Sequence, residues 1–393
     1  MPRWSMFLLF FLVFASIVGG VHYYLYRRMV AAPELAEPWS RALRIALVVL
    51  AISIPVSFFV MRLVGVHAGR YFVFPVYVWM GMMALFFFAF LGLDLLRGIV
   101  SLALRMLGLQ DQLEAPERRL FISRLLCGVA AAIVLPAASV GIFRGLGRLV
   151  VKSIEVRLPG LSPVFDGFKI AQLTDMHLGP MRGGDWTRQV VALTNEVKPD
   201  LVAITGDLVD GSVAELAGDT APLESLSAPS GVFFVTGNHE YFNDLAGWLA
   251  HLPSLGIRIL RNERVSIERD GSSFDLAGVD DPTGVRFAQG HGTDVPKAMK
   301  GRDPNRAMVL LAHQPKVVYE AAEHGVGLVL SGHTHGGQIW PWSYLVRLTQ
   351  PYLRGLHDHD GTKIYVSDGT GFWGPPMRLG STAEITLVTL RSA

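Results

Sequence analysis

Five short polar motifs in the C-terminal half of the chain contain the side-chain types that hold a pair of divalent cations. They are Asp175-Met176-His177, Gly206-Asp207, Gly237-Asn238-His239-Glu240, the single His313, and Gly332-His333-Thr334-His335. Each motif follows an apolar run typical of a β-strand. Aspartate supplies hard oxygen ligands and histidine supplies borderline nitrogen ligands, a mixture that suits Mn, Zn, Fe, Co or Ni better than Ca or Mg. The motifs therefore predict a dinuclear centre of two divalent metal ions, whose identity the sequence leaves open.

The expected ligand set leaves a site with a small positive charge. In Asp175-Met176-His177 the two polar side chains share a face if the local chain is extended. Asp207 has two carboxylate oxygens and could bridge two ions about 3.5–4 Å apart. Two divalent ions, two carboxylates and one hydroxide would together carry about one positive charge. Such a charge favours a phosphate group that binds and then develops negative charge.

Each motif taken alone has a simpler explanation. Asp175 and Asp207 could cap helices or occupy turns. Asn238 after Gly237 is typical of a turn, and the histidines could lie in surface loops. Metal binding is favoured because seven residues of ligand type fall at strand ends in one order.

The elements that must position these motifs predict an α/β layered fold. From about residue 151, strands are expected at 153–158, 169–173, 201–205, 232–235, 274–278, 308–312, 326–330, 363–367 and 384–390, and helices at 185–197, 244–252 and 315–323. Alternating strands and helices are typical of layered sheets, and ligands bind at the strand ends of such sheets. Segment 211–229 is expected to be a loop with about one helical turn.

The motif order resembles that of the calcineurin-like metallophosphoesterase superfamily over residues 151–393. The resemblance implies an α/β protein with a four-layer α/β/β/α sandwich. It also implies that one metal is held by Asp175, His177 and His335, the other by Asn238, His313 and His333, with Asp207 between them. His239 corresponds to the non-ligand catalytic histidine near the leaving group.

A looser resemblance concerns the C-terminal segments Ser367-Asp368-Gly369-Thr370-Gly371 and Pro376-Met377-Arg378-Leu379-Gly380. They are similar to a membrane-associated bacterial subgroup that includes phosphodiesterases and a UDP-2,3-diacylglucosamine pyrophosphatase. Arg378 is a candidate contact to the substrate phosphate, with a surface ion pair as the alternative.

The expected activity is that of a metal-dependent phosphoric ester hydrolase. A hydroxide bridging the two metals would attack a phosphodiester or diphosphate, including a lipid-linked one, and His239 would protonate the leaving oxygen. One alternative is a tethered phosphatase or nucleotide phosphodiesterase of broad specificity. An alternative of another class is a non-catalytic membrane scaffold with a metal-stabilised domain. Metal-dependent turnover of a simple phosphodiester separates the enzymes from the scaffold.

The N-terminal part has the composition of a membrane region. Hydrophobic residues make up 51% of the chain and charged residues 17%. Apolar stretches at 6–26, 42–64, 71–96 and 120–143 approach or exceed the ~20 residues of a transmembrane helix. The sequence thus predicts an all-α transmembrane region at 1–148 with about four helices, followed by the metallophosphoesterase domain at 151–393. The first stretch could instead be a cleaved signal peptide, and 97–112 could be a surface helix or an extension of the third span.

The expected setting is an integral, multi-pass protein of a bacterial cell membrane, with the side of the catalytic domain open. The short link after Arg148 should keep that domain near the bilayer, with membrane lipids as partners. Several apolar residues near the last metal motif could enter the lipid interface or form a buried loop core. They are Trp340, Trp342, Tyr344, Leu345, Val346, Phe372 and Trp373. A net charge of +2 does not suggest nucleic-acid binding. The oligomeric state stays open.

Overall fold

The computed structural model describes residues 3–109, 115–287 and 289–392. The chain forms two compact units. One comprises Met1–Phe143 with Gly374–Met377, and the other comprises Arg144–Trp373 with Arg378–Ala393.

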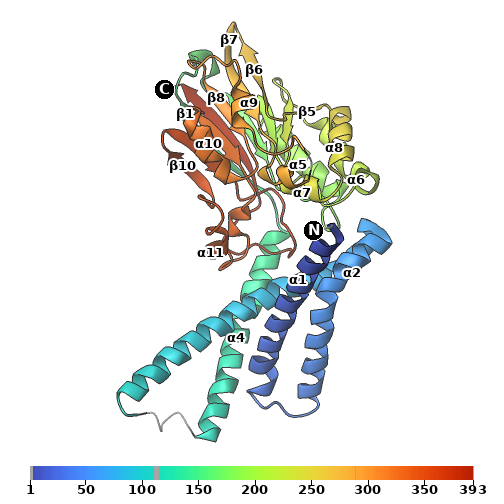
Figure 1. Cartoon of the computed structure of the whole chain (residues 1–393), viewed down its shortest axis with the longest axis vertical. Coiled ribbons are helices and arrows are strands. Elements are labelled where there is room, and N and C mark those ends of the chain that lie inside the picture. Colours follow the sequence, from blue (N-terminus) through green and yellow to red (C-terminus); the bar gives the residue numbers. More distant parts are fainter. Residues whose placement is uncertain (1–2, 110–114, 288, 393) are drawn as a thin grey trace. The chain divides into compact units, whose positions relative to one another are not determined.

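The first unit consists of long apolar helices (Figure 1). They are α1 (Arg3–Tyr26), a short π-helix (Arg27–Ala31), α2 (Trp39–Met106) and α4 (Pro116–Gly145). Within α2, Gly65 has φ 77° and ψ 168°, so the helix is interrupted there. Among the described residues, α2 and α4 are long and apolar enough to cross a membrane. The four apolar stretches of the sequence lie in α1, in the two parts of α2 and in α4. Residues 97–106 extend α2, while 110–114 lie outside the described residues.

The first two helices of this unit pack through a small buried cluster. Val18 of α1 contacts Ile54 and Val76, which come from the two parts of α2. Arg28 forms an ion pair of 2.7 Å with Asp94. Ionisable groups within membrane helices usually pair in this way or line a transport path.

The second unit contains two six-stranded mixed sheets. The strand order of the first is β1 (Val150–Leu158), β12 (Glu384–Ser392), β2 (Lys169–Leu173), β3 (Leu201–Thr205), β4 (Val232–Val235) and β5 (Ile257–Ile259). The order of the second is β10 (Gly355–His359), β11 (Thr362–Val366), β9 (Leu328–Ser331), β8 (Met308–Leu311), β7 (Ser272–Gly278) and β6 (Glu263–Arg269). Strands β2 to β5 are parallel, as are β7, β8, β9 and β11. Their carboxyl ends therefore meet at one edge of each sheet.

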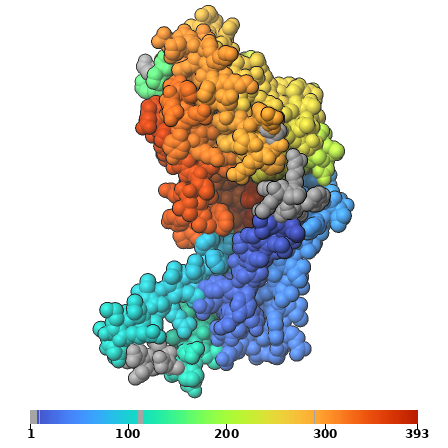
Figure 2. Space-filling view, viewed as in Figure 1, coloured from blue at the N-terminus to red at the C-terminus, as the bar shows by residue number. Residues whose placement is uncertain are grey.

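The sheets pack face to face, and helices cover their outer faces. The core between the sheets joins Ile170 and Phe233 of the first to Phe274 and Val309 of the second. On the outer face of the second sheet lie α9 (Val295–Met299) and α10 (Val318–Glu323), a face that includes the orange surface in Figure 2. Helices α5 (Gly184–Glu196), α6 (Val213–Thr220) and α8 (Leu245–His251) lie on the side of the first sheet (Figure 1). This arrangement confirms the expected four-layer α/β/β/α sandwich.

Some polar edge strands and the shortest helices are not evident from the sequence. All nine expected strands are present within a few residues, but β5, β6 and β10 were not expected. The outer strands β6 and β10 each have a single sheet neighbour. Because an edge strand buries little, its sequence need not alternate clearly. Helix α6 replaces part of the expected loop at 211–229, and its start is fixed by a capping box of Ser212 and Glu215.

Candidate metal centre

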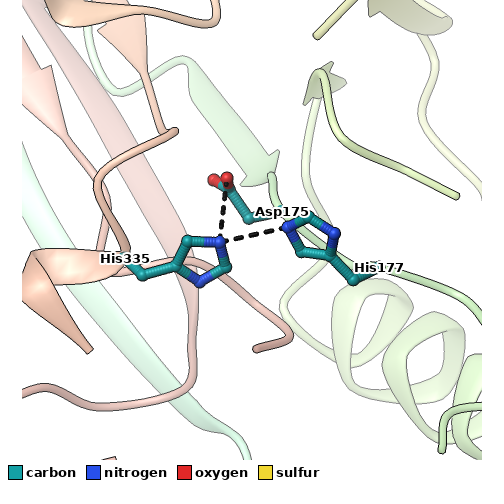
Figure 3. Close-up of side chains that lie close together, drawn as sticks. All are labelled: Asp175, His177 and His335. Carbon is teal, nitrogen blue, oxygen red and sulfur yellow. Dashed lines mark hydrogen bonds and ion pairs between the residues drawn. The ribbon is translucent and has the colours of Figure 1, made fainter. Parts of the chain in front are cut away.

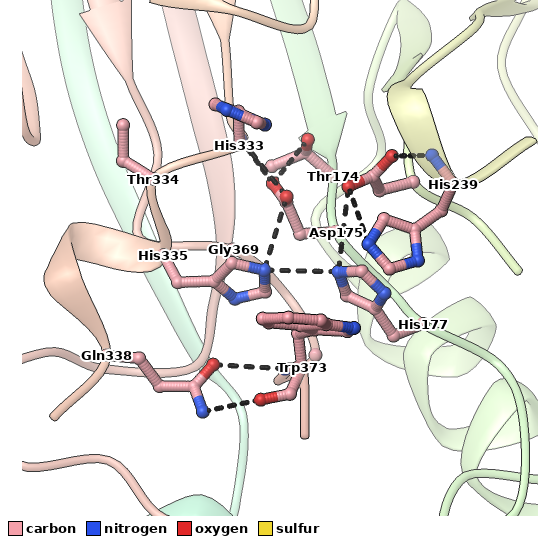
Figure 4. Close-up of polar contacts among 12 residues, drawn as sticks. Thr174, Asp175, His177, His239, His333, Thr334, His335, Gln338, Gly369 and Trp373 are labelled. Carbon is pink, nitrogen blue, oxygen red and sulfur yellow. Dashed lines mark hydrogen bonds and ion pairs between the residues drawn. The ribbon is translucent and has the colours of Figure 1, made fainter. Parts of the chain in front are cut away.

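Loops from both sheets bring six of the seven expected ligands into two clusters with His239 beside them, and Figure 4 shows Asp175, His177, His239, His333 and His335 close together. From the first sheet, Asp175 and His177 follow β2, Asp207 follows β3, and Asn238 and His239 begin α7 (Asn238–Phe242) after β4. From the second sheet, His313 follows β8, and His333 and His335 follow β9. The backbone N–H of Asp175 donates to the Gly206 carbonyl at 3.0 Å, and that of His177 donates to the Asp207 carbonyl at 3.1 Å. The β2–β3 pairing therefore continues into the site.

One cluster consists of Asp175, His177 and His335, which are all buried (Figure 3). The Nε2 atom of His335 lies 3.1 Å from the Nε2 atom of His177. It also lies 3.4 Å from the Oδ1 atom of Asp175. Three possible ligand atoms, two from the loop after β2 and one from the loop after β9, thus lie close together.

A second cluster consists of Asp207, His313 and His333. The Nε2 atom of His313 lies 3.1 Å from the Oδ2 atom of Asp207. The Nδ1 atom of His333 lies 3.2 Å from the same His313 nitrogen. The Oδ2 atom of Asp207 is also 3.8 Å from the Nε2 atom of His177 in the first cluster. One carboxylate oxygen therefore lies between the two clusters.

These donor sets fit two divalent cations. Metal–nitrogen bonds of about 2.1 Å place neighbouring ligand atoms roughly 3.0–3.4 Å apart, the spacing found in both clusters. The Oδ1 atom of Asn238 is buried and has no hydrogen-bond partner among the described residues. A buried amide oxygen normally has a partner, and a cation at the second cluster would supply one. The two His/Asp clusters are thus consistent with a dinuclear metal site.

Asp210, which is not among the site residues expected from the sequence, orients two histidines. The Nδ1 atoms of His177 and His239 lie 3.1 Å and 2.5 Å from its Oδ1 atom. A carboxylate that accepts a hydrogen bond from Nδ1–H leaves Nε2 free to act as a ligand or to carry a proton. The His313 Nδ1 atom is held in the same way, 2.8 Å from the Thr205 carbonyl oxygen. The only sequence signal for Asp210 was an acidic residue three positions after Asp207.

His239 lies beside the clusters, although it belongs to neither expected ligand set. Its Nε2 atom is 3.9 Å from the Oδ2 atom of Asp207. Its backbone N–H donates to the other oxygen of that carboxylate at 2.8 Å. Burial lowers the pKa of His239, but the charges of Asp207 and Asp210 outweigh burial and raise that pKa to about 9. The Nδ1 atom of the imidazole is thus held by Asp210, and its Nε2 atom faces the carboxylate of Asp207.

Glu240 ties the loop after β4 to the loop after β3. Its carboxylate accepts hydrogen bonds from the backbone N–H groups of Gly237, Asp207 and Leu208, at 2.7, 3.1 and 2.8 Å. Burial raises the pKa of Glu240 to about 7. The last residue of the Gly237–Glu240 motif thus fixes the spacing between the two ligand loops.

The site is built on strained backbone. Five of the seven expected ligands have a left-handed backbone: Asp175 (φ 52°), His177 (48°), Asp207 (51°), His333 (69°) and His335 (50°). This conformation costs a residue with a side chain roughly 1–2 kcal/mol. Such strain persists only where the surrounding structure enforces it, and it gathers at functional sites.

Two glycines allow the ligand loops to approach each other closely. A Cβ atom on Gly237 would overlap the carboxylate of Asp207. A Cβ atom on Gly332 would overlap the side chains of Asp175 and Thr174. The glycines of these motifs are therefore needed for close approach at the metal ligands.

We expect Gly332→Ala to damage the site through this overlap. The added methyl group must displace Asp175, at a cost of about 1–3 kcal/mol in the free energy of unfolding. Thermal unfolding in detergent and metal analysis should show a lower Tm and less bound metal. Gly218→Ala is the matched control, because Gly218 lies in α6 with nothing within 4 Å of the added Cβ. If the Tm and the metal content of Gly332→Ala equal those of this control, the close approach at Gly332 is not needed for the site.

Arg378, the candidate phosphate contact, is completely buried. Its guanidinium donates to the carbonyl oxygens of Gly369, Gly371 and His335, and to the Ser381 hydroxyl at 3.0 Å. Burial lowers the pKa of Arg378 to about 10. These contacts hold the 369–371 loop against the loop of His335. The surface ion pair considered as the alternative is wrong, because the side chain is not on the surface.

His357 and His359 lie in the edge strand β10. The His357 Nε2 atom is 2.7 Å from the Arg354 carbonyl oxygen, and the His359 Nδ1 atom is 3.1 Å from the Tyr352 hydroxyl. Among the described residues, neither histidine belongs to a group of side chains that could hold a metal ion.

Comparison with known proteins agrees with the chemistry of these clusters. A family model described as calcineurin-like phosphoesterase matches residues 168–337. An uncharacterized metallophosphoesterase of Campylobacter jejuni is 30% identical over 392 residues, covering 98% of this chain and 99% of the relative. One from Bacillus subtilis is 30% identical over 286 residues, covering 70% of this chain and 98% of the relative.

A cattle relative carries a name that mentions a membrane. This "Transmembrane protein with metallophosphoesterase domain" is 39% identical over 276 residues, covering 67% of this chain. The match spans 62% of the cattle protein, which is less than two thirds of its length.

Proposed function

The chain belongs to the calcineurin-like metallophosphoesterase family, and from this premise we propose that it is a membrane-anchored enzyme that hydrolyses a phosphodiester or diphosphate. The two clusters carry this proposal, together with the Asp207 carboxylate of the second cluster, which lies 3.8 Å from His177 of the first. We assign one metal to Asp175, His177 and His335, and the other to Asn238, His313 and His333, with Asp207 between them. The proposed domains are a transmembrane region at 1–148 and a catalytic domain at 151–393.

The protein groups have separate tasks in this proposal. When bound, the two cations supply positive charge that activates water and stabilises phosphoryl oxygens. Asp210 holds His239 with its Nε2 atom turned toward Asp207. From this position His239 gives a proton to the departing oxygen. Glu240 keeps the two ligand loops of the first sheet at a fixed distance.

Exposed apolar side chains near α11 (Ser343–Val346) support a membrane-associated substrate. Trp340, Tyr344, Leu345 and Leu348 expose 56, 63, 43 and 80% of their surface. The alternative of a buried loop core therefore does not describe them. The segment begins five residues after His335. Aromatic residues of this kind are enriched at membrane–water interfaces. Together with the long apolar helices, they favour a lipid-linked phosphoester and a multi-pass location in a cell membrane.

The substrate class can be tested with purified protein in detergent. We expect turnover of bis(4-nitrophenyl) phosphate in the presence of Mn²⁺, and loss of that turnover with EDTA. We also expect faster turnover of micellar lipid-linked diphosphates, such as the UDP-diacylglucosamine type, than of soluble nucleotides. Trp340→Ser with Tyr344→Ser should reduce the micellar rate several-fold and leave the soluble rate unchanged.

Two outcomes would contradict parts of the proposal. No metal-dependent turnover of any phosphoester would support the non-catalytic scaffold. Equal or better turnover of soluble nucleotides would support the tethered phosphatase or nucleotide phosphodiesterase and would exclude the lipid-linked substrate.

A further inference from the structure

Two exposed aromatic side chains lie next to His239, and a third lies beside one of them. The rings of Trp373 and Phe242 are 5.6 and 5.5 Å from the His239 ring, both edge to face. The ring of Phe287 is 5.6 Å from that of Phe242. Trp373, Phe242 and Phe287 expose 57, 55 and 43% of their surface. We call these three residues the aromatic wall.

The aromatic wall is fixed by the same loops that carry the metal-type clusters. The side-chain amide of Gln338 donates to the Trp373 carbonyl at 2.9 Å and accepts from the Trp373 N–H at 3.0 Å (Figure 4). Gln338 follows His335 by three residues and has a left-handed backbone with φ 39°. The N–H groups of Thr370 and Gly371 donate to the carbonyl oxygens of Thr174 and Asp175, both at 2.8 Å. These bonds dock the chain before Trp373 on the loop that carries Asp175.

The other two rings have their own supports. Phe242 ends α7, the helix that begins with Asn238. Phe287 packs against buried Tyr241 at 6.0 Å between ring centroids. The wall therefore keeps its place relative to His239, because every part of it is held by elements of the site.

Exposed aromatic rings beside a charged site require a reason. Their exposure forgoes the free energy that burial would give. Exposed apolar groups that gather in one place commonly mark a binding surface. A ring also offers a flat face, and aromatic pairs have preferred stacked or edge-to-face geometries. A phosphate bound at the clusters would direct its leaving group toward His239, and so toward these rings.

We propose that the aromatic wall binds a leaving group with a flat aromatic ring, such as an aryl group or a nucleobase. This inference rests on the proposed function, because it places the leaving group beside His239. Trp373 is its main specificity-determining residue, since its ring is the most exposed of the three and its backbone is held by Gln338. Nucleotide–lipid diphosphates contain such a ring, so this class agrees with a membrane-associated substrate.

Two non-hydrolysable probes of similar size test the proposal. Phenylphosphonate carries a flat ring, and cyclohexylphosphonate carries a ring that is not flat. Binding of both to the metal-loaded full-length protein is measured by calorimetry. We expect phenylphosphonate to bind roughly three- to tenfold more tightly, as expected for one aromatic contact. Trp373→Ala should bring this ratio close to one, and Trp373→Phe should keep most of it.

Tyr319→Ala is the control, because Tyr319 is an exposed aromatic residue of α10, on the outer side of the second sheet. It should leave the ratio unchanged. Equal binding of the two probes by the unmodified protein, or an unchanged ratio in Trp373→Ala, would overturn the proposal. If Trp373→Ala weakens the binding of both probes equally, the site recognises any apolar leaving group and not a flat ring. That result would also overturn the proposal. A further outcome is that the protein shows no turnover while the ratio of the two affinities still falls in Trp373→Ala. That result would support the aromatic wall and would contradict only the proposed hydrolysis.

Discussion

Asp207→Asn is expected to reduce kcat/KM by about 10³-fold or more and to lower the bound metal from two ions per chain to one or none. The Oδ2 atom of Asp207 lies 3.1 Å from the Nε2 atom of His313 and 3.8 Å from that of His177. Asparagine keeps the size of the side chain but removes the charge, and its amide N–H₂ group cannot act as a ligand. Charge stabilisation by metal ions contributes several kcal/mol to catalysis, and each 1.36 kcal/mol corresponds to a tenfold change in rate.

Rates with bis(4-nitrophenyl) phosphate and elemental analysis of the purified protein measure this effect. Asp185→Asn is the matched control, because the Asp185 side chain is 92% exposed and pairs only with Arg188 among the interactions described. We expect no change in its rate or metal content. If Asp207→Asn keeps two ions and full turnover, the assignment of Asp207 as the shared ligand is wrong.

His239→Ala is expected to keep both metal ions and to lose about 10²–10⁴-fold in kcat for esters of poor leaving groups, the usual contribution of a general acid. Its ring nitrogens contact Asp210 and face Asp207, but His239 belongs to neither proposed ligand set. The loss should be smaller for 4-nitrophenyl esters, because 4-nitrophenolate departs readily without a proton. This difference between leaving groups separates proton donation from a general structural effect.

Two further variants complete this experiment. Asp210→Asn should weaken both catalysis and metal binding, because Asp210 orients a proposed ligand, His177, as well as His239. His324→Ala, at the C-terminal end of α10, should change neither. If His239→Ala retains full kcat with poor leaving groups, His239 is not the proton donor. If it loses metal, His239 is a ligand.

The sequence shows which loops carry the chemistry because two local rules operate there. Buried parallel strands appear as short apolar runs, and ligands follow the ends of such strands. Asp175 after β2, Asp207 after β3 and His313 after β8 could therefore all be located. The same rules fail for β6 and β10, since an edge strand is shaped by its one neighbour and by solvent.

Residue types and their order along the chain were thus sufficient to determine the α/β class, the apolar N-terminal helices and the kind of atoms offered to a metal. Only the tertiary structure decided which of these atoms meet. His177 and His335 are 158 residues apart in sequence, and their nitrogens lie 3.1 Å from each other. Likewise, only the tertiary structure shows that Arg378 is buried, that Asp210 contacts two histidines, and that the Trp373 ring packs against the His239 ring. The His177–His335 and Trp373–His239 contacts depend on the packing of the two sheets, and the contacts of Asp210 depend on the order of the strands within the first sheet. Local sequence carries no record of either arrangement.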